Sequence, residues 1–492
     1  MGVGMKLGKN IFGVGAMTGI SRIFGFVRDM LIARFLGAGR MSDIFFAAFK
    51  LPNLFRDLLG EGALSAIFIP MYTDMKKDEG FAKNVFSWLM VILLGLTIVF
   101  EIFMPLVVWA LAPGFSEDPG KMQLTVTIAR IMFFYVIFIC GAAFLSAVLN
   151  AHSRFMLAAF MPVMLNIMLI AALATSVFYG NQYIIYVMAA TVVLSGILQF
   201  FILWQRIRAK HFGLRLIIPH WNKQIKNMFK RFGVSLVGSG FYQITIIVGT
   251  LVASWQSGAV SWLYYSDRMV QLPFAMIGLA VGTVLISSIS KALTDGNMRS
   301  VYLQQNSSMR RSMMLIIPCM VGLFVLAEPI IRILFQHGAW THESTMAVAL
   351  AIKIQCLVLP AMLISQIYSK TLYASQDVNT PVRTSVISLG IATVIYLALF
   401  PLIGYLSIPV GVVISGYIKN YLLGHVCRKR QLIKTDKKTI FATLVFTCIS
   451  VALGFVLSTV YISNVIMLGI AIVGFALLYL PISFVIDRFL IK

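Results

Sequence analysis

The residues best suited to chemistry in this chain gather in one apolar stretch, residues 42–70. Its sequence, SDIFFAAFKLPNLFRDLLGEGALSAIFIP, is long enough to cross a bilayer as a helix. Each charge at the centre of a lipid-facing helix costs about 2.5–3.5 kcal/mol. Charged side chains in this stretch must therefore face a bundle interior or a water-filled cavity, where they usually mark a substrate path. The charged residues are Asp43, Lys50, Arg56, Asp57 and Glu61.

The same stretch is expected to bend. Pro52 lacks a backbone N–H, and Gly60 and Gly62 weaken a helix. A bend inside a membrane is tolerated where neighbouring groups or water satisfy the freed backbone groups. One alternative stays open, in which Lys50 reaches the membrane surface and Arg56 pairs with a nearby acid as a structural contact. The cost of burying so many charges favours a polar, bendable helix inside a bundle.

Three more arginines lie in apolar spans: Arg22 and Arg28 in the run SRIFGFVRD, and Arg268 in the run SWLYYSDRM. Arginine stays charged and presents a planar fork of donors that matches phosphate oxygens. With Arg56, these residues would favour a di-anionic group such as a pyrophosphate over a neutral drug. The alternative is a scatter of helix-to-helix salt bridges, which explains one or two pairs but not an excess of cations.

Three acidic residues, Asp43, Glu61 and Asp267, are candidate gate residues. They could hold the arginines apart while the site is empty, or latch two halves of the protein together. Adjacent residues on a helix point about 100° apart, so Asp267 and Arg268 are each expected to find a partner elsewhere. An arginine of the first half is the expected partner of Asp267, and substrate phosphate that of Arg268.

The composition identifies a polytopic, all-α integral membrane protein. The chain has 492 residues, of which 60% are hydrophobic and only 12% charged, and its mean hydropathy is +0.91. Soluble domains carry about 25% charged residues. Apolar runs of bilayer length predict fourteen spans. They lie near 11–36, 42–72, 84–110, 124–149, 156–179, 183–206, 229–255, 259–290, 312–335, 346–372, 383–404, 406–427, 439–461 and 464–486.

The distribution of positive charge sets the expected orientation. Most of the 40 Lys and Arg residues lie in the termini and in alternate loops, with a dense group at 206–231. This asymmetry is the positive-inside pattern. We expect a multi-pass protein of the bacterial cytoplasmic membrane with both termini in the cytoplasm. The net charge of +23 then reflects loops that face anionic lipid headgroups, and nucleic acid is not an expected partner.

Catalytic and cofactor sites are not expected. The five Cys and six His residues show no spacing typical of metal ligands. The glycines of residues 2–9 only faintly resemble a phosphate-binding loop, because their spacing is wrong and Asn10 stands where Ser or Thr is needed. We expect a transporter without metal, cofactor or nucleotide-hydrolysis site, driven by an ion gradient or the membrane potential.

A short internal similarity suggests the domain organisation. Charged residues precede Leu51-Pro52 in the second span and Leu272-Pro273 in the eighth, and glycines follow both pairs. This predicts two six-helix halves of parallel topology, residues 1–210 and 211–430. Residues 431–492 would add helices 13 and 14. The basic stretch 206–231 could form an amphipathic surface helix that tethers one half to the other.

The quoted runs, together with SQDVNTPV at 375–382, closely resemble the MurJ (MviN) family along essentially the whole chain. That family comprises bacterial flippases of lipid II, the undecaprenyl-pyrophosphate-linked precursor of peptidoglycan. It belongs to the multidrug/oligosaccharidyl-lipid/polysaccharide exporter superfamily. The resemblance implies two six-helix halves around a V-shaped central cavity, with helices 13 and 14 forming a groove for the lipid tail.

The resemblance also implies roles for individual residues. Arg22 and Arg28 match essential arginines of the first helix, and Ser261 matches a position that lines the cavity. The remaining matches are to functional positions of the second and eighth helices: Asp43, Asn53, Arg56, Glu61, Asp267 and Arg268. The substrate-binding set implied is Arg22, Arg28, Asn53, Arg56, Ser261 and Arg268.

The driving force is expected to differ from that of some family members. Those members bind sodium through acidic and amide residues of spans seven, eleven and twelve. The corresponding spans of this chain contain no acidic residue, and Gln243, Thr393 and Asn420 are the nearest candidates. We therefore expect cycling driven by membrane potential rather than by sodium.

Two other functions stay open beside a lipid II flippase working by alternating access in cell-wall biogenesis and cell shape. One is a different exporter of the superfamily, either an oligosaccharide-lipid flippase or a multidrug antiporter, which usually has twelve spans and lacks this arginine set. The other is a non-transporting scaffold that recruits cell-wall synthesis proteins, which are candidate partners in either case. A scaffold should tolerate Arg56→Ala, whereas a flippase should not.

The predicted orientation can be tested by cysteine labelling. Cysteines introduced at Ser116 and Ser344, in loops poor in cations, should react with a membrane-impermeant reagent from outside. A cysteine at Gln224 should not, because the cations around it resist translocation. Labelling at Gln224 from outside would overturn the orientation.

Overall fold

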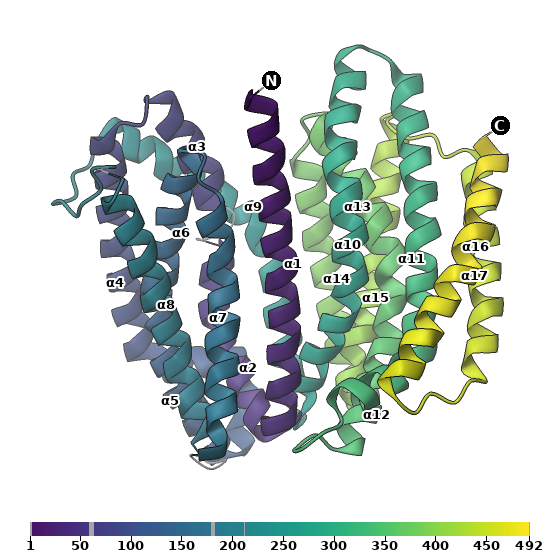
Figure 1. The fold of residues 1–492 in the computed structure, drawn as a ribbon, viewed down its shortest axis with the longest axis horizontal. Helices are drawn as coiled ribbons and strands as arrows, with labels where there is room; N and C mark the ends of the chain where they lie inside the picture. The colour runs from purple at the N-terminus through teal and green to yellow at the C-terminus, as the bar shows by residue number, and fades with distance from the viewer. Residues whose placement is uncertain (1, 59–62, 179–182, 211, 492) are drawn as a thin grey trace. The chain divides into compact units, whose positions relative to one another are not determined.

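The computed structural model describes residues 2–58, 63–178, 183–210 and 212–491. It describes their side chains except at 2–12, 14, 63, 177, 234–242, 279–287 and 490–491. All regular structure in the described residues is helical (Figure 1), which confirms the predicted all-α class. Glu61 lies outside the described residues, and its predicted role stays a prediction.

The chain folds into two compact units, and each is described by itself. Unit 1, Met1–Ser257, contains α1 (Gly2–Leu36), α2 (Arg40–Phe55), α3 (Ala63–Asp74), α4 (Glu79–Leu111), η2 (Pro113–Glu117), α5 (Pro119–Phe133), α6 (Tyr135–Ala151), α7 (Met156–Thr175), η3 (Ser176–Phe178), α8 (Ile184–Arg208) and α9 (Lys223–Ala253). Helices α1 and α7, α6 and α8, and α2 and α5 pack against each other, and α9 packs on α3 and α4.

Unit 2 comprises Gly258–Lys492. Its elements are α10 (Ala259–Thr294), α11 (Met298–Phe335), α12 (His342–Gln355), η4 (Cys356–Val358), α13 (Leu359–Ala374), α14 (Asn379–Ile403), η5 (Gly404–Leu406), α15 (Ser407–Lys429), α16 (Lys437–Ser458) and α17 (Val465–Ile491). Helix α10 packs on α11, α12 and α13, and α14 packs on α15. The predicted boundaries at 210/211 and 430/431 stay a prediction.

Nine segments of the described chain are long and apolar enough to cross a membrane. One of them, Asn379–Lys429, folds into the packed pair α14 and α15, and so holds two of the predicted spans. Helices α1, α2 and α10 are not among the nine. These three helices carry most of the predicted site residues. The integral membrane class is confirmed, while the count of fourteen stays a prediction.

The second predicted span changes helix type after Phe55, and Gly60 and Gly62, on which the expected bend also rests, lie outside the described residues. Helix α2 ends at Phe55, residues 56–58 make a π turn, and α3 begins at Ala63. Pro52 lies inside α2, one turn before the π turn. Pro273 lies inside α10, which continues to Thr294 without interruption. A proline alone therefore does not end a helix in this protein, and the sequence similarity between the two regions does not extend to the backbone.

Aromatic side chains fill the core of unit 1. Phe68 of α3 stacks on Tyr72 at 5.1 Å and on Phe81 of α4 at 6.0 Å, and contacts Phe144 of α6 at 4.6 Å between ring centroids. Phe144 also stacks on Phe86 of α4 at 5.5 Å. Such pairs add about 0.5–1.5 kcal/mol beyond the area they bury. The second half of this predicted span is thereby fixed to α4 and α6.

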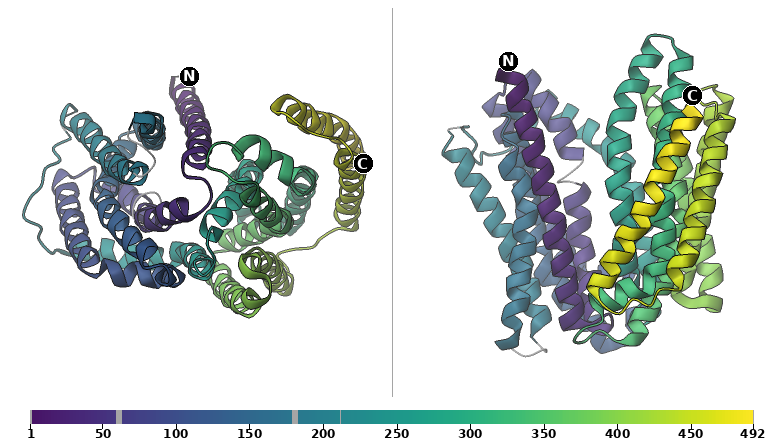
Figure 2. Two further views of the ribbon diagram at one scale, coloured as in Figure 1. Left: turned by 90° about the horizontal axis from the view of Figure 1, so that it is seen from below. Right: turned by 45° about the vertical axis from the view of Figure 1, so that its right-hand side comes forward.

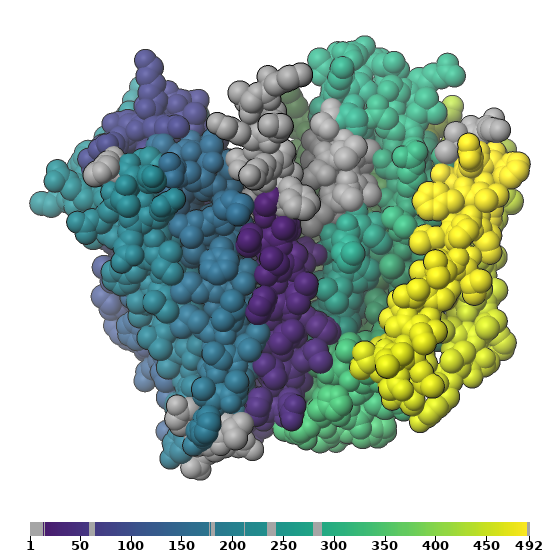
Figure 3. Space-filling view, in the orientation of Figure 1, coloured from purple at the N-terminus to yellow at the C-terminus, as the bar shows by residue number. Residues whose placement is uncertain are grey.

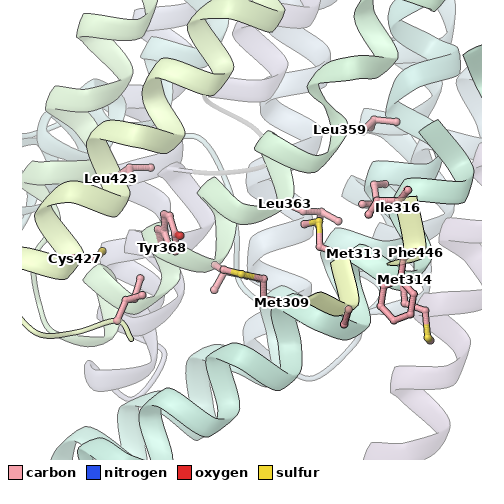
Figure 4. Close-up of a cluster of buried hydrophobic side chains, with 14 of the residues drawn as sticks. Met309, Met313, Met314, Ile316, Leu359, Leu363, Tyr368, Leu423, Cys427 and Phe446 are labelled. Carbon is pink, nitrogen blue, oxygen red and sulfur yellow. The ribbon is translucent and has the colours of Figure 1, made fainter. Parts of the chain in front are cut away.

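A cluster of aliphatic and sulfur-containing side chains forms the core of unit 2 (Figure 4). Met313 and Ile316 of α11 lie in it together with Leu363 of α13, Leu423 of α15 and Phe446 of α16, all nearly inaccessible to solvent. Burying a side chain of this size contributes about 1.5–3 kcal/mol. The cluster therefore ties α16 to the rest of unit 2.

Helices α16 and α17 form a hairpin along α11 (Figure 2). A buried ion pair joins Nε of Arg310 in α11 to Oδ1 of Asp487 in α17. Near the other end of the hairpin, Nη2 of Arg332 donates to the carbonyl oxygen of Ile462 at 2.6 Å. The segment entering the hairpin is also fixed, because the Asn306 side chain bonds the backbones of Lys434 and Asp436.

The predicted amphipathic surface helix at 206–231 is wrong in its central part. Residues 212–222 have no regular secondary structure, and the following basic residues begin α9. The reason is local, since Asn84 of α4 exchanges two hydrogen bonds with the backbone of His220, and the Ser87 hydroxyl accepts one from the N–H of Ile217. These contacts hold the backbone groups that a helix would use for its own bonds.

One labelling position also needs correction. Ser344 is buried at the start of α12, where it bonds the Thr341 hydroxyl. Glu343 beside it is exposed. A cysteine at Glu343 therefore replaces the one at Ser344 in the labelling experiment.

The ion pair between α11 and α17 predicts the stability of the hairpin. Asp487→Ala leaves Arg310 charged and buried without its acid, and should destabilise the protein by about 3–5 kcal/mol. The double variant Arg310→Met/Asp487→Leu removes both charges and should unfold close to wild type. Thermal unfolding in detergent measures both. An Asp487→Ala variant as stable as wild type would show that the pair does not hold the hairpin.

Candidate functional site

The predicted site residues divide between the two units. Those described in the first and second spans lie on α1, on α2 and in the π turn after α2 in unit 1, and those of the eighth span lie on α10 in unit 2. Each group is described within its own unit.

Arg28 is held firmly inside unit 1. It is 7% exposed, and its Nε and Nη2 donate to Oδ1 of Asp29 at 3.0 and 2.6 Å. Its Nη1 donates to Oδ1 of Asn166 in α7 at 2.9 Å. The Nδ2 atom of Asn166 donates to the carbonyl oxygen of Ser21 at 3.1 Å, and so is fixed itself. A charge-assisted network of this kind fixes the plane of the guanidinium fork.

Arg22 lies in a different environment on the same helix. Its side chain is exposed within unit 1, as is that of the next residue, Ile23. No ion pair of Arg22 is seen among the described residues. The helix-to-helix salt bridge that the alternative interpretation requires is therefore not seen at this arginine.

The first half of α2 is anchored by its own charged residues. The carboxylate of Asp43, 0% exposed, pairs with Nζ of Lys121 in α5 at 2.9 Å. Lys50 donates to Thr250 Oγ1 and, at 3.2 Å, to the carbonyl oxygen of Ile246, both in α9. Lys50 thus contacts the neighbouring helix α9, and the alternative in which it reaches the membrane surface stays a prediction.

The π turn after α2 carries a second arginine network. Nε and Nη2 of Arg56 donate to Oδ1 of Asp57 at 3.3 and 3.1 Å, and Nε2 of Gln243 in α9 donates to Oδ2 of Asp57 at 3.1 Å. Both charged side chains are partly open, with 26% and 35% of their surface exposed. Oδ1 of Asn53 is buried and has no hydrogen-bond partner among the described residues. A donor from a ligand would satisfy this atom.

In unit 2, Asp267 and Arg268 have partners on separate side chains. Gln355 of α12 donates to Oδ1 of Asp267 and accepts a hydrogen bond from Ser266 at 3.1 Å. Arg268 is exposed and receives its contact from Tyr264, whose hydroxyl accepts from Nε and Nη2 at 3.3 and 3.1 Å. The predicted pairing of Asp267 with the first half stays a prediction.

Ser261 is fully buried at the start of α10. Its predicted contact with substrate is not tested by this placement and stays a prediction.

The expectation that adjacent residues on a helix do not pair with each other does not hold throughout this protein. It separated Asp267 from Arg268, yet Arg28 bonds Asp29 and Arg56 bonds Asp57, each directly next to it in the sequence. The long arginine side chain bends back across the turn, which a rule based on Cα–Cβ directions does not consider.

Sequence reasoning missed four residues that orient the site: Lys121, Asn166, Gln243 as a partner of Asp57, and Gln355. All four are polar side chains within or at the ends of apolar helices. Because a polar group in such a place needs a partner, a search for isolated amides and lysines in the spans would have found them.

Removing Asn166 should loosen Arg28. Asn166→Leu keeps the size of the side chain but removes the acceptor of Arg28 Nη1 and the donor to Ser21. A buried hydrogen bond to a charged group contributes about 1.5–3 kcal/mol, so the unfolding temperature in detergent should fall and transport should drop. Asn150→Leu, which alters an amide in α6 away from Arg28, is the control. Equal stability of Asn166→Leu and wild type would show that Asn166 does not hold Arg28.

Comparisons with known proteins give the family. The model of the family described as lipid II flippase MurJ matches residues 32–482. A probable lipid II flippase MurJ of Rhizobium tropici is 34% identical over 423 residues, which are 84% of this chain and 79% of that protein. The lipid II flippase MurJ of Burkholderia cenocepacia is 31% identical over 445 residues, 87% of this chain and 85% of that protein.

Solved structures agree with this assignment. A lipid II flippase MurJ in an inward closed conformation has a TM-score of 0.85 and 26% identity, covering 97% of this chain and 99% of that chain. An inward-facing multidrug resistance transporter of the MATE family, in the MOP superfamily, has a TM-score of 0.70 at 14% identity, covering 84% and 94%. The second likeness shows the fold alone. Together these findings confirm the predicted family and the class of transporter, and the chain belongs to the lipid II flippase MurJ family.

Proposed function

We propose that this chain translocates lipid II from the cytoplasmic to the outer leaflet of the bacterial cytoplasmic membrane by alternating access. Membership of the family supports the substrate. The observation that carries the proposal is the state of the arginines in unit 1. Arg28 and Arg56 each have their guanidinium fork turned to an adjacent carboxylate, and Arg22 is exposed.

The acidic neighbours explain how such arginines remain in the membrane without substrate. Asp29 and Asp57 accept at the same two nitrogens, Nε and Nη2, of Arg28 and Arg56. A phosphate oxygen bonds arginine through the same fork. In this proposal the carboxylates keep the cations paired while the site is empty, and the pyrophosphate of lipid II replaces them when it binds.

The exposure of each arginine indicates how easily its carboxylate partner can be replaced by phosphate. Arg56 and Asp57 are partly open, so substrate can reach them with little rearrangement. The Arg28–Asp29 pair is almost closed, with side chains 8% and 5% exposed. Arg22 and Arg56 would therefore meet the headgroup first, and Arg28 would engage only as the helices move.

Asn53 would contribute a neutral contact to the same headgroup. Its buried Oδ1 atom has no partner among the described residues and lies one turn before Arg56. Hydroxyl or amide groups of the sugar and peptide can donate to it. In unit 2, Arg268 would donate to phosphate oxygens, Ser261 would contact substrate, and Asp267 would act as a gate residue.

The lipid tail would follow the surface of α16 and α17. Figure 3 shows α17 uncovered along the face of unit 2. Most exposed side chains of α17 are apolar, among them Ile466, Ile470, Leu477 and Phe489. A polyprenyl chain would remain against such a surface while the headgroup crosses.

The driving force and orientation are also part of the proposal. The membrane potential would act on the cationic helices, since moving one charge across 100 mV corresponds to about 2.3 kcal/mol. Both termini would lie in the cytoplasm, and proteins of cell-wall synthesis would bind the basic loops. The other exporter functions and the scaffold are weaker because no observation in the structure favours them.

Arginine substitutions test the proposal. In a strain depleted of the native protein, Arg28→Ala and Arg56→Ala should fail to support growth, and lipid II should accumulate in the cytoplasmic leaflet. Arg28→Lys should retain part of the activity, because lysine keeps the charge but not the fork. Arg34→Ala, at the exposed last turn of α1, is the control and should grow normally.

Two results would contradict this assignment. Full growth of a normally expressed Arg56→Ala strain would favour a scaffold. Growth failure without accumulation of lipid II in the cytoplasmic leaflet would show that a different substrate is carried.

A further inference from the structure

The first turns of α2 and α5 are joined by two ion pairs of opposite sense. Arg40 and Asp43 lie three residues apart on α2, and Asp118 and Lys121 lie three residues apart at the start of α5. Arg40 pairs with Asp118 at 2.9 Å, and Asp43 pairs with Lys121 at 2.9 Å. The cation comes from α2 in the first pair and from α5 in the second, so the two helices can form both pairs in only one relative register.

The two pairs differ sharply in burial. Arg40 and Asp118 are 45% and 48% exposed, whereas Lys121 and Asp43 are 6% and 0% exposed. An exposed pair is screened by solvent and holds little. A buried pair is costly to break, because removing one partner leaves the other charged and unpaired. The buried pair Asp43–Lys121 therefore restrains α2 against α5, and the exposed pair Arg40–Asp118 lies beside it.

Lys121 is itself held by the surrounding helices. Its ammonium lies 4.0 Å from the centre of the buried Phe115 ring in η2. Element η2 is packed tightly against the end of α9, since a Cβ on Gly114 would lie 2.5 Å from the backbone of Ser254. The Ser254 hydroxyl also accepts from the N–H of Gly114 at 2.9 Å. The α5 side of the contact is therefore a fixed support.

Other residues of α2 up to Phe55 are also held by hydrogen bonds. Lys50 bonds α9, and Ser42 closes the turn before α2 through the carbonyl oxygen of Gly37 at 2.8 Å. Beyond Phe55 the helix stops, and the next contacts are those of the Arg56–Asp57–Gln243 network. Figure 1 shows α2 and α5 meeting at the lower end of unit 1.

We propose that Lys121 is a positioning residue for transport: through Asp43 it locks the first turns of α2 to α5, so that the second span changes shape at the π turn 56–58, which carries Arg56. This rests on the proposed function, because Arg56 is the residue whose movement matters. Lys121 itself contacts Asp43 and Phe115 rather than substrate. We call the Asp43–Lys121 contact the clamp. It requires an ion pair of fixed geometry between α2 and α5, whichever of the two helices carries the carboxylate.

Four variants separate the clamp from simple stability. Lys121→Met should lower the rate of lipid II translocation about ten-fold or more, a coupling of ordinary size for such contacts. Lys121→Arg should keep most of the rate. Asp43→Leu/Lys121→Met removes both charges of this pair and should unfold at a higher temperature than Lys121→Met, but should remain slow. Asp43→Lys/Lys121→Asp restores an ion pair and should regain most of the lost rate.

The measurements are the rate in proteoliposomes with fluorescent lipid II and thermal unfolding of the same preparations. Arg40→Gln, which removes the exposed pair on the same two helices, is the matched control and should transport normally. Growth of a depleted strain provides an independent readout. If wild-type protein moves no lipid II, the proposed function fails, and growth still decides the clamp.

Three results would overturn the proposal. Wild-type activity of Lys121→Met, or of Asp43→Leu/Lys121→Met, would show that the pair is dispensable or merely structural. A folded but inactive Asp43→Lys/Lys121→Asp protein would show that the Asp43 carboxylate acts on its own. If that exchanged protein does not fold, the comparison of Asp43→Leu/Lys121→Met with wild type decides alone.

Discussion

The free-energy cost of placing a charge in hydrocarbon determines where the charged residues of this protein lie. An uncompensated charge or an unpaired backbone group has no water to bond within a bilayer, so helices must enclose their polar groups or pair them. The buried cations Arg28, Lys121 and Arg310 each contact a carboxylate. Unlike a soluble protein, this one cannot leave such groups on its apolar surface, and its charged residues therefore reveal where helices meet.

Burial separates two kinds of ion pair. Asp43 with Lys121, and Arg310 with Asp487, join different helices and are almost closed to solvent. Arg56 with Asp57 joins neighbours in the sequence and is partly open. Breaking the first kind exposes two helices to separation, whereas opening the second kind costs little backbone movement. The first kind suits a fixed frame, and the second suits a cation that exchanges its partner for a phosphate.

The second predicted span contains both a fixed part and the cation that would exchange its partner. Before the π turn at 56–58, α2 is fixed to α5 and α9 by Asp43 and Lys50. After it, α3 is fixed to α4 and α6 by the stacked ring of Phe68. The π turn at 56–58 lies between two anchored helices and carries Arg56. A change of shape in this span would thus be concentrated next to the arginine that the proposed function requires.

The sequence by itself determined the membrane class, the helical fold and the family, because these follow from apolar length and local motifs. It also singled out the arginines, since a charge in an apolar run is visible without any structure. Only the tertiary structure decided the distant partners of the site residues: Asn166 bonds Arg28, Lys121 pairs with Asp43, and Gln243 bonds Asp57. It also decided that residues 212–222 are not helical, because side chains of α4 bond the backbones of Ile217 and His220. Pairing depends on which helix faces meet, and one sequence does not specify that.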